Sequence, residues 1–338
     1  MRLGFLFFCL PLCADLIDLQ DLSQDFVLET KQIEISGCPY AFNPSMVRWH
    51  GYILMSFRFI PDPTSPFTSW IGLVLLDEQF NPVGEPQLLN IRDGTTNVPS
   101  RADDARLLYV GDKLMIVYSD NPNPKITGGG FRMMIGELHF TNGSFALQNA
   151  VRLVEYEGEK ETLREKNWTP FEYRSSLFLS YSIDPHRVFF PIPGKGTCIT
   201  YATTFPSLHW EWGILRGGTP ALMLESGEYF AFFHSAKKMA TQNSQGKTMT
   251  HYYMGAYTFE PEPPFRITRF SKEPIVGPGF YKGRSYKPYW GSIQCVFPAG
   301  MIMEGNTIWL SYGRQDHEIW IAKIDKKKLL DSLETFHN

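Results

Sequence analysis

The segment Met46-Val-Arg-Trp-His-Gly-Tyr-Ile-Leu-Met-Ser-Phe-Arg58 decides the architecture of this chain. It contains two runs of β-prone residues, and Gly51 stands in the short turn between them. Two such runs separated by a few turn residues are typical of a β-hairpin. The segment therefore predicts a pair of antiparallel strands.

The same hairpin pattern recurs along the whole chain. Further copies are Arg106–Tyr118, Pro170–Tyr181, Ala221–His234 and Gly300–Tyr312. Most copies are followed by another apolar strand, at Trp70–Leu76, Phe131–Leu138, Tyr252–Tyr257 and Ile319–Ile324. A β-sandwich would use similar strands, but five matching units of about four strands favour an all-β, five-bladed β-propeller. Helical periodicity predicts one short C-terminal helix from Asp325 to Phe336.

The composition limits the possible partners and cofactors. The chain has 338 residues, 43% of them hydrophobic and 20% charged, which is enough to build a large packed core. Its formal net charge of −3 argues against a nucleic-acid partner, which would need a dominant basic face. Cys38, Cys198 and Cys295 are widely spaced, which favours buried free thiols over a disulfide framework. No spacing of metal ligands is found, so we expect neither a metal site nor an organic cofactor.

The N-terminus has the composition of a signal peptide. Arg2 precedes an apolar run from Leu3 to Leu12, and Ala14 follows it before polar sequence begins. The run is too short to span a bilayer. We therefore predict a signal peptide at residues 1–14, an exported product and a single propeller domain at residues 15–338. A lipid anchor at Cys13 is the alternative to simple cleavage.

The propeller topology predicts where a functional site would form. The first strand of each blade lines the central channel, so the residues just before these strands gather at one mouth. The five blade starts are Asn43-Pro-Ser, Asp103-Asp-Ala-Arg106, Glu165-Lys-Asn-Trp168, Arg216-Gly-Gly-Thr-Pro220 and Phe297-Pro-Ala-Gly300. Carboxylates, amides and cations in one ring suit a sugar, and a carboxylate can transfer a proton at a glycosidic oxygen. Asp104 is the leading candidate for that role, and a turn-capping aspartate is the structural alternative.

An ordered series of motifs resembles glycoside hydrolase family 130. The series is Asn43-Pro, Arg58, Asp103-Asp104-Ala-Arg106, Lys166-Asn167, Gly218-Thr-Pro220, His234, Tyr252 with Gly255, Phe297-Pro-Ala-Gly300, Tyr312-Gly and Asp316. The resemblance runs from about residue 40 to residue 325. The family consists of five-bladed propellers that are β-mannoside phosphorylases or β-mannosidases. The resemblance therefore implies that this chain is an enzyme that acts on a β-mannoside glycan.

The resemblance also implies roles for individual residues. Asp104 matches the catalytic acid of a Glu-Asp-Pro-Arg motif, which here reads Asp-Asp-Ala-Arg. The residues implied to bind the sugar are Asn43, Arg58, Arg106 and Asp316, together with Asp103 and Asn167 from the same motifs. Those implied to bind phosphate are Lys166, His234 and Tyr252. Inorganic phosphate would then be a co-substrate that attacks the anomeric carbon with inversion, held by several charge-assisted donors.

Departures from the family pattern keep other functions open. A basic phosphate ligand expected in the third blade is not found there, so Arg187 takes its place or phosphate is not the acceptor. The segment from Glu165 to His186 is also similar to related β-mannosyltransferases, which would build the bond from an activated donor. A non-catalytic carbohydrate-binding propeller is a further alternative. An arabinanase-type glycosidase is disfavoured, because that type has an aspartate where this chain has Asn43.

Overall fold

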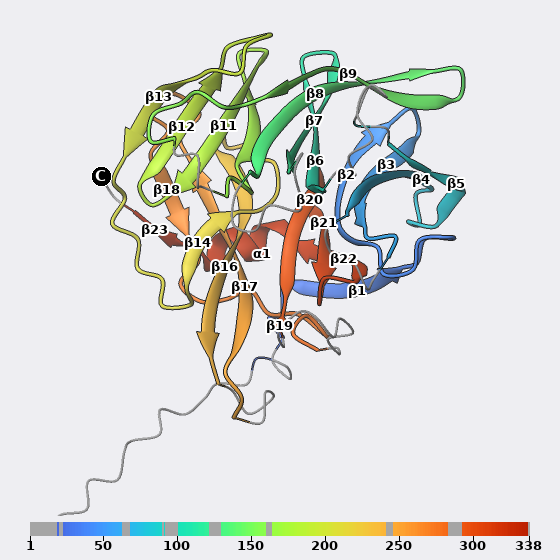
Figure 1. Cartoon of the computed structure of the whole chain (residues 1–338). Helices are drawn as coiled ribbons and strands as arrows, with labels where there is room; N and C mark the ends of the chain where they lie inside the picture. The colour runs from blue at the N-terminus through green and yellow to red at the C-terminus, as the bar shows by residue number, and fades with distance from the viewer. Residues whose placement is uncertain are drawn as a thin grey trace, which may run out of the picture.

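The structure is a computed structural model that describes residues 19, 23–62, 68–89, 91, 101–121, 130–159, 164–240, 246–282 and 293–336. Within these residues, antiparallel sheets are arranged around a common axis as five blades of a β-propeller (Figure 1). The predicted fold is confirmed. The predicted signal peptide at residues 1–14 lies outside the described residues, and export stays a prediction.

The first three blades are consecutive four-stranded sheets. Blade 1 contains β2 (Phe42–Trp49), β3 (Tyr52–Phe59), β4 (Trp70–Leu76) and β5 (Pro82–Leu88). Blade 2 contains β6 (Ala102–Val110), β7 (Lys113–Asp120), β8 (Arg132–Thr141) and β9 (Ser144–Arg152). Blade 3 contains β10 (Thr169–Tyr173), β11 (Ser176–Ile183), β12 (His186–Pro191) and β13 (Cys198–Thr204).

Blade 4 is larger than the others. Its main strands are β14 (Ile214–Gly217), β16 (Tyr229–Met239), β17 (Met249–Phe259) and β18 (Ile267–Phe270). The short strands β15 (Leu222–Met223), β19 (Ile293–Gln294) and β23 (Glu334–Thr335) pair with them at the edges. The C-terminal helix α1 (Lys326–Ser332) is shorter than predicted, because Leu333 leaves the helical conformation and the chain continues into β23.

The ring is closed by strands from both ends of the chain. Blade 5 contains β20 (Val296–Glu304), β21 (Thr307–Arg314) and β22 (Glu318–Asp325), and the N-terminal strand β1 (Val27–Ile33) completes it. β1 pairs antiparallel with β22 (Figure 1). The sequence analysis did not predict β1, since an outer strand with Glu29 and Lys31 shows no long apolar run. This pairing covers the outer edge of β22 and makes the charged strand β1 the outer edge of the last blade.

Packing between blades forms the core. Buried side chains from neighbouring blades make continuous apolar clusters, one of which joins blades 3 and 4 through stacked and edge-on aromatic rings. Cys38, Cys198 and Cys295 are buried free thiols, as predicted. In the described part of the chain, no helix has both the length and the apolarity needed to cross a membrane.

The closing strand pair can be tested through Ile324, which is fully buried opposite Val27 and Ile308. We expect Ile324→Ala to lower the free energy of unfolding by about 2–5 kcal/mol, because it leaves a cavity in the core. The matched control is Ile214→Ala, since Ile214 is 70% exposed, and it should change stability by less than about 0.5 kcal/mol. Urea unfolding gives the free energy of unfolding of both variants. Equal decreases in the two variants would show that the closing strand pair contributes no special stability.

Candidate active site

A repeated backbone irregularity places the polar residues of the blade starts. The pairing of β2 with β3 shifts between Phe42 and Ser45, and that of β6 with β7 shifts between Asp103 and Arg106. Asn43 and Asp104 lie in these bulges with positive φ angles of 49° and 54°. Asn167, just before β10, has a φ of 63°. Bulges re-aim side chains, and Asn and Asp tolerate this conformation better than most residues.

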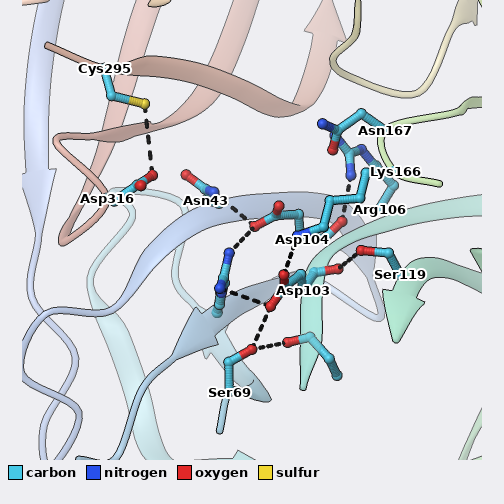
Figure 2. Close-up of polar contacts among 12 residues, drawn as sticks. Asn43, Ser69, Asp103, Asp104, Arg106, Ser119, Lys166, Asn167, Cys295 and Asp316 are labelled. Atoms are coloured by element: carbon cyan, nitrogen blue, oxygen red, sulfur yellow. Dashed lines mark hydrogen bonds and ion pairs between the residues drawn. The ribbon is translucent and has the colours of Figure 1, made fainter. Parts of the chain in front are cut away.

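Asp104 lies at the centre of the resulting cluster, as Figure 2 shows. Its Oδ1 accepts a hydrogen bond from Asn43 Nδ2 at 2.8 Å and lies 3.5 Å from Arg58 Nη1. All three residues are buried, with at most 5% of their surface exposed. The structure therefore brings together three residues that are far apart in the sequence and that were predicted to share one site.

Asp103 lies behind Asp104 and has no exposed surface. Its Oδ1 lies 2.8 Å from Arg58 Nη2 and accepts a hydrogen bond from Ser69 Oγ at 2.6 Å, and its Oδ2 pairs with Lys166 Nζ (Figure 2). Burial opposes ionisation, but the charges of Arg58, Lys166 and Arg101 outweigh it and lower the pKa of Asp103 to about 2. Both oxygens are engaged by the protein, so Asp103 holds the cations in place and offers no free face to a sugar.

The family resemblance implied that Lys166 binds phosphate. The structure instead pairs Lys166 with Asp103 and places its ammonium 3.8 Å from the ring centroid of Phe131. Glu165 accepts hydrogen bonds from Trp168 and Tyr181. Lys166 keeps 22% of its side chain exposed, so it remains within reach of a ligand at the mouth.

Arg106 ties three blades together beneath the site. Its guanidinium donates to the backbone oxygens of Gly218 (2.9 Å) and Asp104 (2.6 Å) and to Asn167 Oδ1 (3.1 Å). Only 1% of Arg106 is exposed, and burial lowers its pKa to about 10, which leaves it charged at neutral pH. Arg106 and Asn167 thus lie in the predicted cluster, with Arg106 fixing the backbone that carries Asp104.

Asp316 approaches the cluster from blade 5. It lies in the turn between β21 and β22 with a φ of 56°, and Cys295 Sγ contacts its Oδ1 at 3.7 Å (Figure 2). Arg58 is fully buried, which disfavours its charge, but Asp103, Asp104 and Asp316 together raise its pKa. Asp316 therefore belongs to the same electrostatic cluster as Asp104, as the sequence predicted.

His234 and Tyr252 form a second group in blade 4. Their rings stack with centroids 5.8 Å apart, and His234 Nδ1 lies 2.7 Å from the Gly217 carbonyl oxygen. A carbonyl can only accept, so Nδ1 carries the hydrogen and Nε2 presents a lone pair. Burial, together with the charges of Arg106 and Arg216, lowers the pKa of His234 to about 3. His234 is therefore neutral at pH 7 and is not the charged donor that a predicted phosphate ligand would supply.

The structure adds residues that the sequence analysis did not single out. Arg216 is exposed and lies opposite His234 in the β14–β16 pair, so the two side chains share one face. Arg216 belongs to one of the five blade-start segments, and this position was the feature of the sequence from which it could have been predicted. No feature of the sequence indicated Ser69 or Cys295, because their place in the cluster depends on contacts with other segments of the chain. Arg187, the predicted substitute ligand, instead contacts Glu157 and Tyr181 and is not joined to the cluster.

No metal centre is found in this cluster. Among the residues that the structure describes, no group of three or more His, Cys, Asp or Glu side chains is arranged to hold a metal ion. The chemistry that the cluster can perform on its own is proton transfer by a carboxylate and hydrogen bonding to hydroxyl groups or anions.

The buried charge cluster gives a stability prediction. Asp103→Asn leaves Arg58 and Lys166 without their shared counter-charge, so it should cost about 3–5 kcal/mol at pH 7. The pKa of Asp103 is lowered from 3.8 to about 2, so its stabilisation is complete above about pH 4 and is lost as the pH falls towards 2. The difference between wild type and variant should therefore shrink over that range in urea unfolding.

The matched control for this prediction is Asp331→Asn. Asp331 pairs with Lys327 on the surface, where both side chains are more than half exposed. We expect a change below about 1 kcal/mol at every pH. A constant difference between Asp103→Asn and wild type from pH 7 to pH 2 would contradict the assignment of the acid-sensitive stability to Asp103.

Comparison with solved structures supports the fold. A glycosyl hydrolase from Bacteroides ovatus matches with a TM-score of 0.62 and 16% identity over 86% of this chain and 85% of that one. A β-1,2-mannobiose phosphorylase from Listeria innocua matches with a TM-score of 0.58 and 15% identity, over 90% of this chain and 92% of that one. A mannose phosphorylase from Leishmania mexicana, solved with a phosphate ion, matches at 0.59 and 12%, over 92% of each chain. A search of curated proteins found no match.

The sequence profile of a family gives the assignment. The profile described as β-1,4-mannooligosaccharide phosphorylase, of glycoside hydrolase family 130, matches residues 26–335. That range contains all five blades and every residue of the cluster around Asp104. The match covers most of the chain, and the structural relatives share its propeller. This chain therefore belongs to glycoside hydrolase family 130, whose members are mannoside phosphorylases and hydrolases.

Proposed function

We propose that this enzyme cleaves β-mannosidic bonds with inversion and that Asp104 donates the proton to the leaving group. The observation that carries the proposal is the position of Asp104, held between Asn43 and Arg58 at the start of β6. Membership of the family supports the substrate class, and the geometry around Asp104 supports the choice of this residue.

The contacts of Asp104 leave one carboxylate oxygen for proton transfer. In the described part of the chain, its hydrogen bonds from side chains fall on Oδ1. Oδ2 is then the oxygen that can carry the proton towards a substrate. Asn43 and Arg58 fix the plane of the carboxyl group, which is the positioning that an efficient proton transfer needs. Asp316 is partly exposed beside the same cluster and would bind hydroxyl groups of the mannosyl unit, whereas the buried Arg106 would act by fixing the backbone of Asp104.

The nucleophile would approach from blade 4. Arg216 is the exposed cation beside His234 and Tyr252, and the neutral His234 offers a lone pair at Nε2. A guanidinium binds phosphate well, while the histidine lone pair can accept a hydrogen from hydrogen phosphate or from water. In an inverting reaction the acid and the nucleophile act on opposite sides of the sugar. Blades 2 and 4 contribute these two groups separately.

Product analysis tests the reaction. β-1,2- and β-1,4-mannobiose should be consumed, and if phosphate is the nucleophile each mannobiose should give one mannose 1-phosphate and one mannose. Two molecules of mannose per mannobiose and no mannose 1-phosphate, with or without added phosphate, would show hydrolysis. Turnover only with mannose 1-phosphate or a nucleotide-linked mannose plus an acceptor, with no cleavage of either mannobiose, would overturn the proposal in favour of a transferase.

Asp104→Asn removes the proton donor while it keeps the shape of the side chain. We expect kcat for mannobiose cleavage to fall by about 10²–10⁴-fold, because general acid catalysis typically contributes that factor. Mannobiose binding, measured by calorimetry, should persist. Glu165→Gln is the control, since Glu165 is a buried carboxylate whose partners are Trp168 and Tyr181. A larger loss in Glu165→Gln than in Asp104→Asn would refute the assignment.

Gly313 gives a second test of the same geometry. A Cβ at Gly313 would lie 2.0 Å from Asn43 Oδ1, so an alanine there must displace Asn43 from Asp104. We expect Gly313→Ala to lower kcat by on the order of a hundredfold, as a small misplacement near the reacting atoms can do. Gly72→Ala is the matched control, because its Cβ would meet the Phe57 ring at 2.2 Å, away from Asp104. Equal kcat values for the two folded variants would contradict the role of Asn43.

A further inference from the structure

A groove of about 670 Å³ lies between blades 1 and 2 at the end of the strands that is remote from Asp104. Its walls come from the end of β2, the β2–β3 and β6–β7 turns and the end of β8. Trp49, Tyr109 and Phe140 line it, and His50 and Asp112 lie in the two turns. The volume is in the range of sites that bind small ligands.

The groove is separate from the catalytic cluster. Asp104 lies near the start of β6, whereas Tyr109 lies near the end of the same strand. At about 3.3 Å per residue, five residues of strand separate them by roughly 16 Å. The residues between them are buried in blade 2, so a ligand in the groove cannot reach Asp104.

The aromatic side chains of the groove are partly solvent-exposed. Phe140 keeps 45% of its surface exposed and Tyr109 keeps 38%. Trp49 packs edge-on against Phe140 and is tilted against Phe145, with ring centroids 4.9 and 5.0 Å apart. These contacts hold the rings in place. The protein thus presents aromatic surface to solvent inside a groove, where another molecule can cover it.

A neighbouring hollow shows that the aromatic lining is not required by the fold. A space of about 590 Å³ lies at the next blade junction, between blades 2 and 3. Serines, prolines and aliphatic side chains line most of it, and Phe190 is the one aromatic among its described lining residues. Propeller geometry therefore produces hollows between blades, while the cluster of Trp49, Tyr109 and Phe140 is a property of the first junction.

Polar groups surround the rings. His50 lies in the β2–β3 turn with its ring centroid 4.8 Å from that of Trp49, and Asp112 is exposed in the β6–β7 turn. At the far side Glu137 pairs with Lys113 at 2.9 Å and contacts His139 at 3.3 Å. Aromatic faces suit the C–H faces of sugar rings, and the surrounding polar groups suit their hydroxyls. The acidic net charge of the protein disfavours a nucleic acid.

We propose that this groove is a secondary site that binds a β-mannan chain. The sugar class rests on the function proposed above, whereas the existence of a carbohydrate site rests on the groove alone. Such a site would hold the enzyme on a polymeric substrate while another part of the same mannan molecule, or a second mannan molecule, reaches Asp104. The binding gain would then come from raising the local concentration of substrate.

The test is native electrophoresis in gels that contain soluble β-1,4-mannan or β-1,2-mannan, with dextran as the sugar control. Wild type should be retarded by a mannan and not by dextran. The double variant Tyr109→Ala/Phe140→Ala should lose affinity on the order of tenfold, because two ring contacts are removed. Both side chains are exposed, so the fold should persist, and mannobiose turnover should stay at the wild-type rate. Phe205→Ala is the matched control, since Phe205 is an aromatic residue that is 78% exposed elsewhere.

Each outcome decides the proposal. The proposal is overturned if the double variant is retarded as strongly as wild type, or if Phe205→Ala loses as much retardation as the double variant. It is also overturned if neither mannan retards the wild type. Sedimentation that shows self-association in wild type and none in the double variant would make the groove an interface between copies and would also overturn it. Asp104→Asn separates the two proposals, since it should lose turnover and keep the retardation.

Discussion

The ion pairs of Asp103 are the interaction on which the site depends. One buried carboxylate joins Arg58 from blade 1 to Lys166 from the segment before blade 3. Arg58 is in turn the cation that contacts Asp104. Buried charges are costly unless they are paired, and here each charge has a partner from a different part of the chain. The position of the predicted acid is therefore fixed by contacts from the neighbouring blades as well as by its own strand.

Backbone conformation is the second constraint. Asn43, Asp104, Asn167 and Asp316 all have positive φ angles, and each stands at the entrance to the cluster. Non-glycine residues in this conformation cost free energy, and such strain concentrates at functional sites. Close packing adds to the constraint, since Gly313 leaves room for Asn43 and Gly217 leaves room for the backbone of Asn167. The glycines thus allow the polar residues to approach one another from separate blades.

Much of the fold and of the cluster could be predicted from the sequence. The hairpin repeat is a local pattern, and strands such as β3 and β7 lie where their apolar runs predicted them. The rule that blade starts meet at one mouth then placed Asn43 and Asp104 together. β1 was missed, because an outer strand with charged residues has no local pattern that distinguishes it.

The electrostatic roles of the site residues could not be predicted from the local sequence. Asp103 and Asp104 are neighbours of identical type, yet one is sealed among cations and the other is set among Asn43 and Arg58. The partner of Lys166 is Asp103 rather than the adjacent Glu165, and His234 is neutral because of its burial and its two neighbouring arginines. These properties arise from contacts between distant segments, which no spacing of residues along the chain encodes.

The pairing of β1 with β22 also orders events during synthesis. β1 leaves the ribosome long before β22, and it cannot take its place in blade 5 until β22 has been made. Until then the nascent chain carries an incomplete ring with an open seam between its two ends. Contacts of such wide sequence separation form slowly and leave unpaired edges exposed in the meantime. A chain released before Glu318 would hold four blades and most of the polar cluster, but it would lack β22, the strand with which β1 pairs.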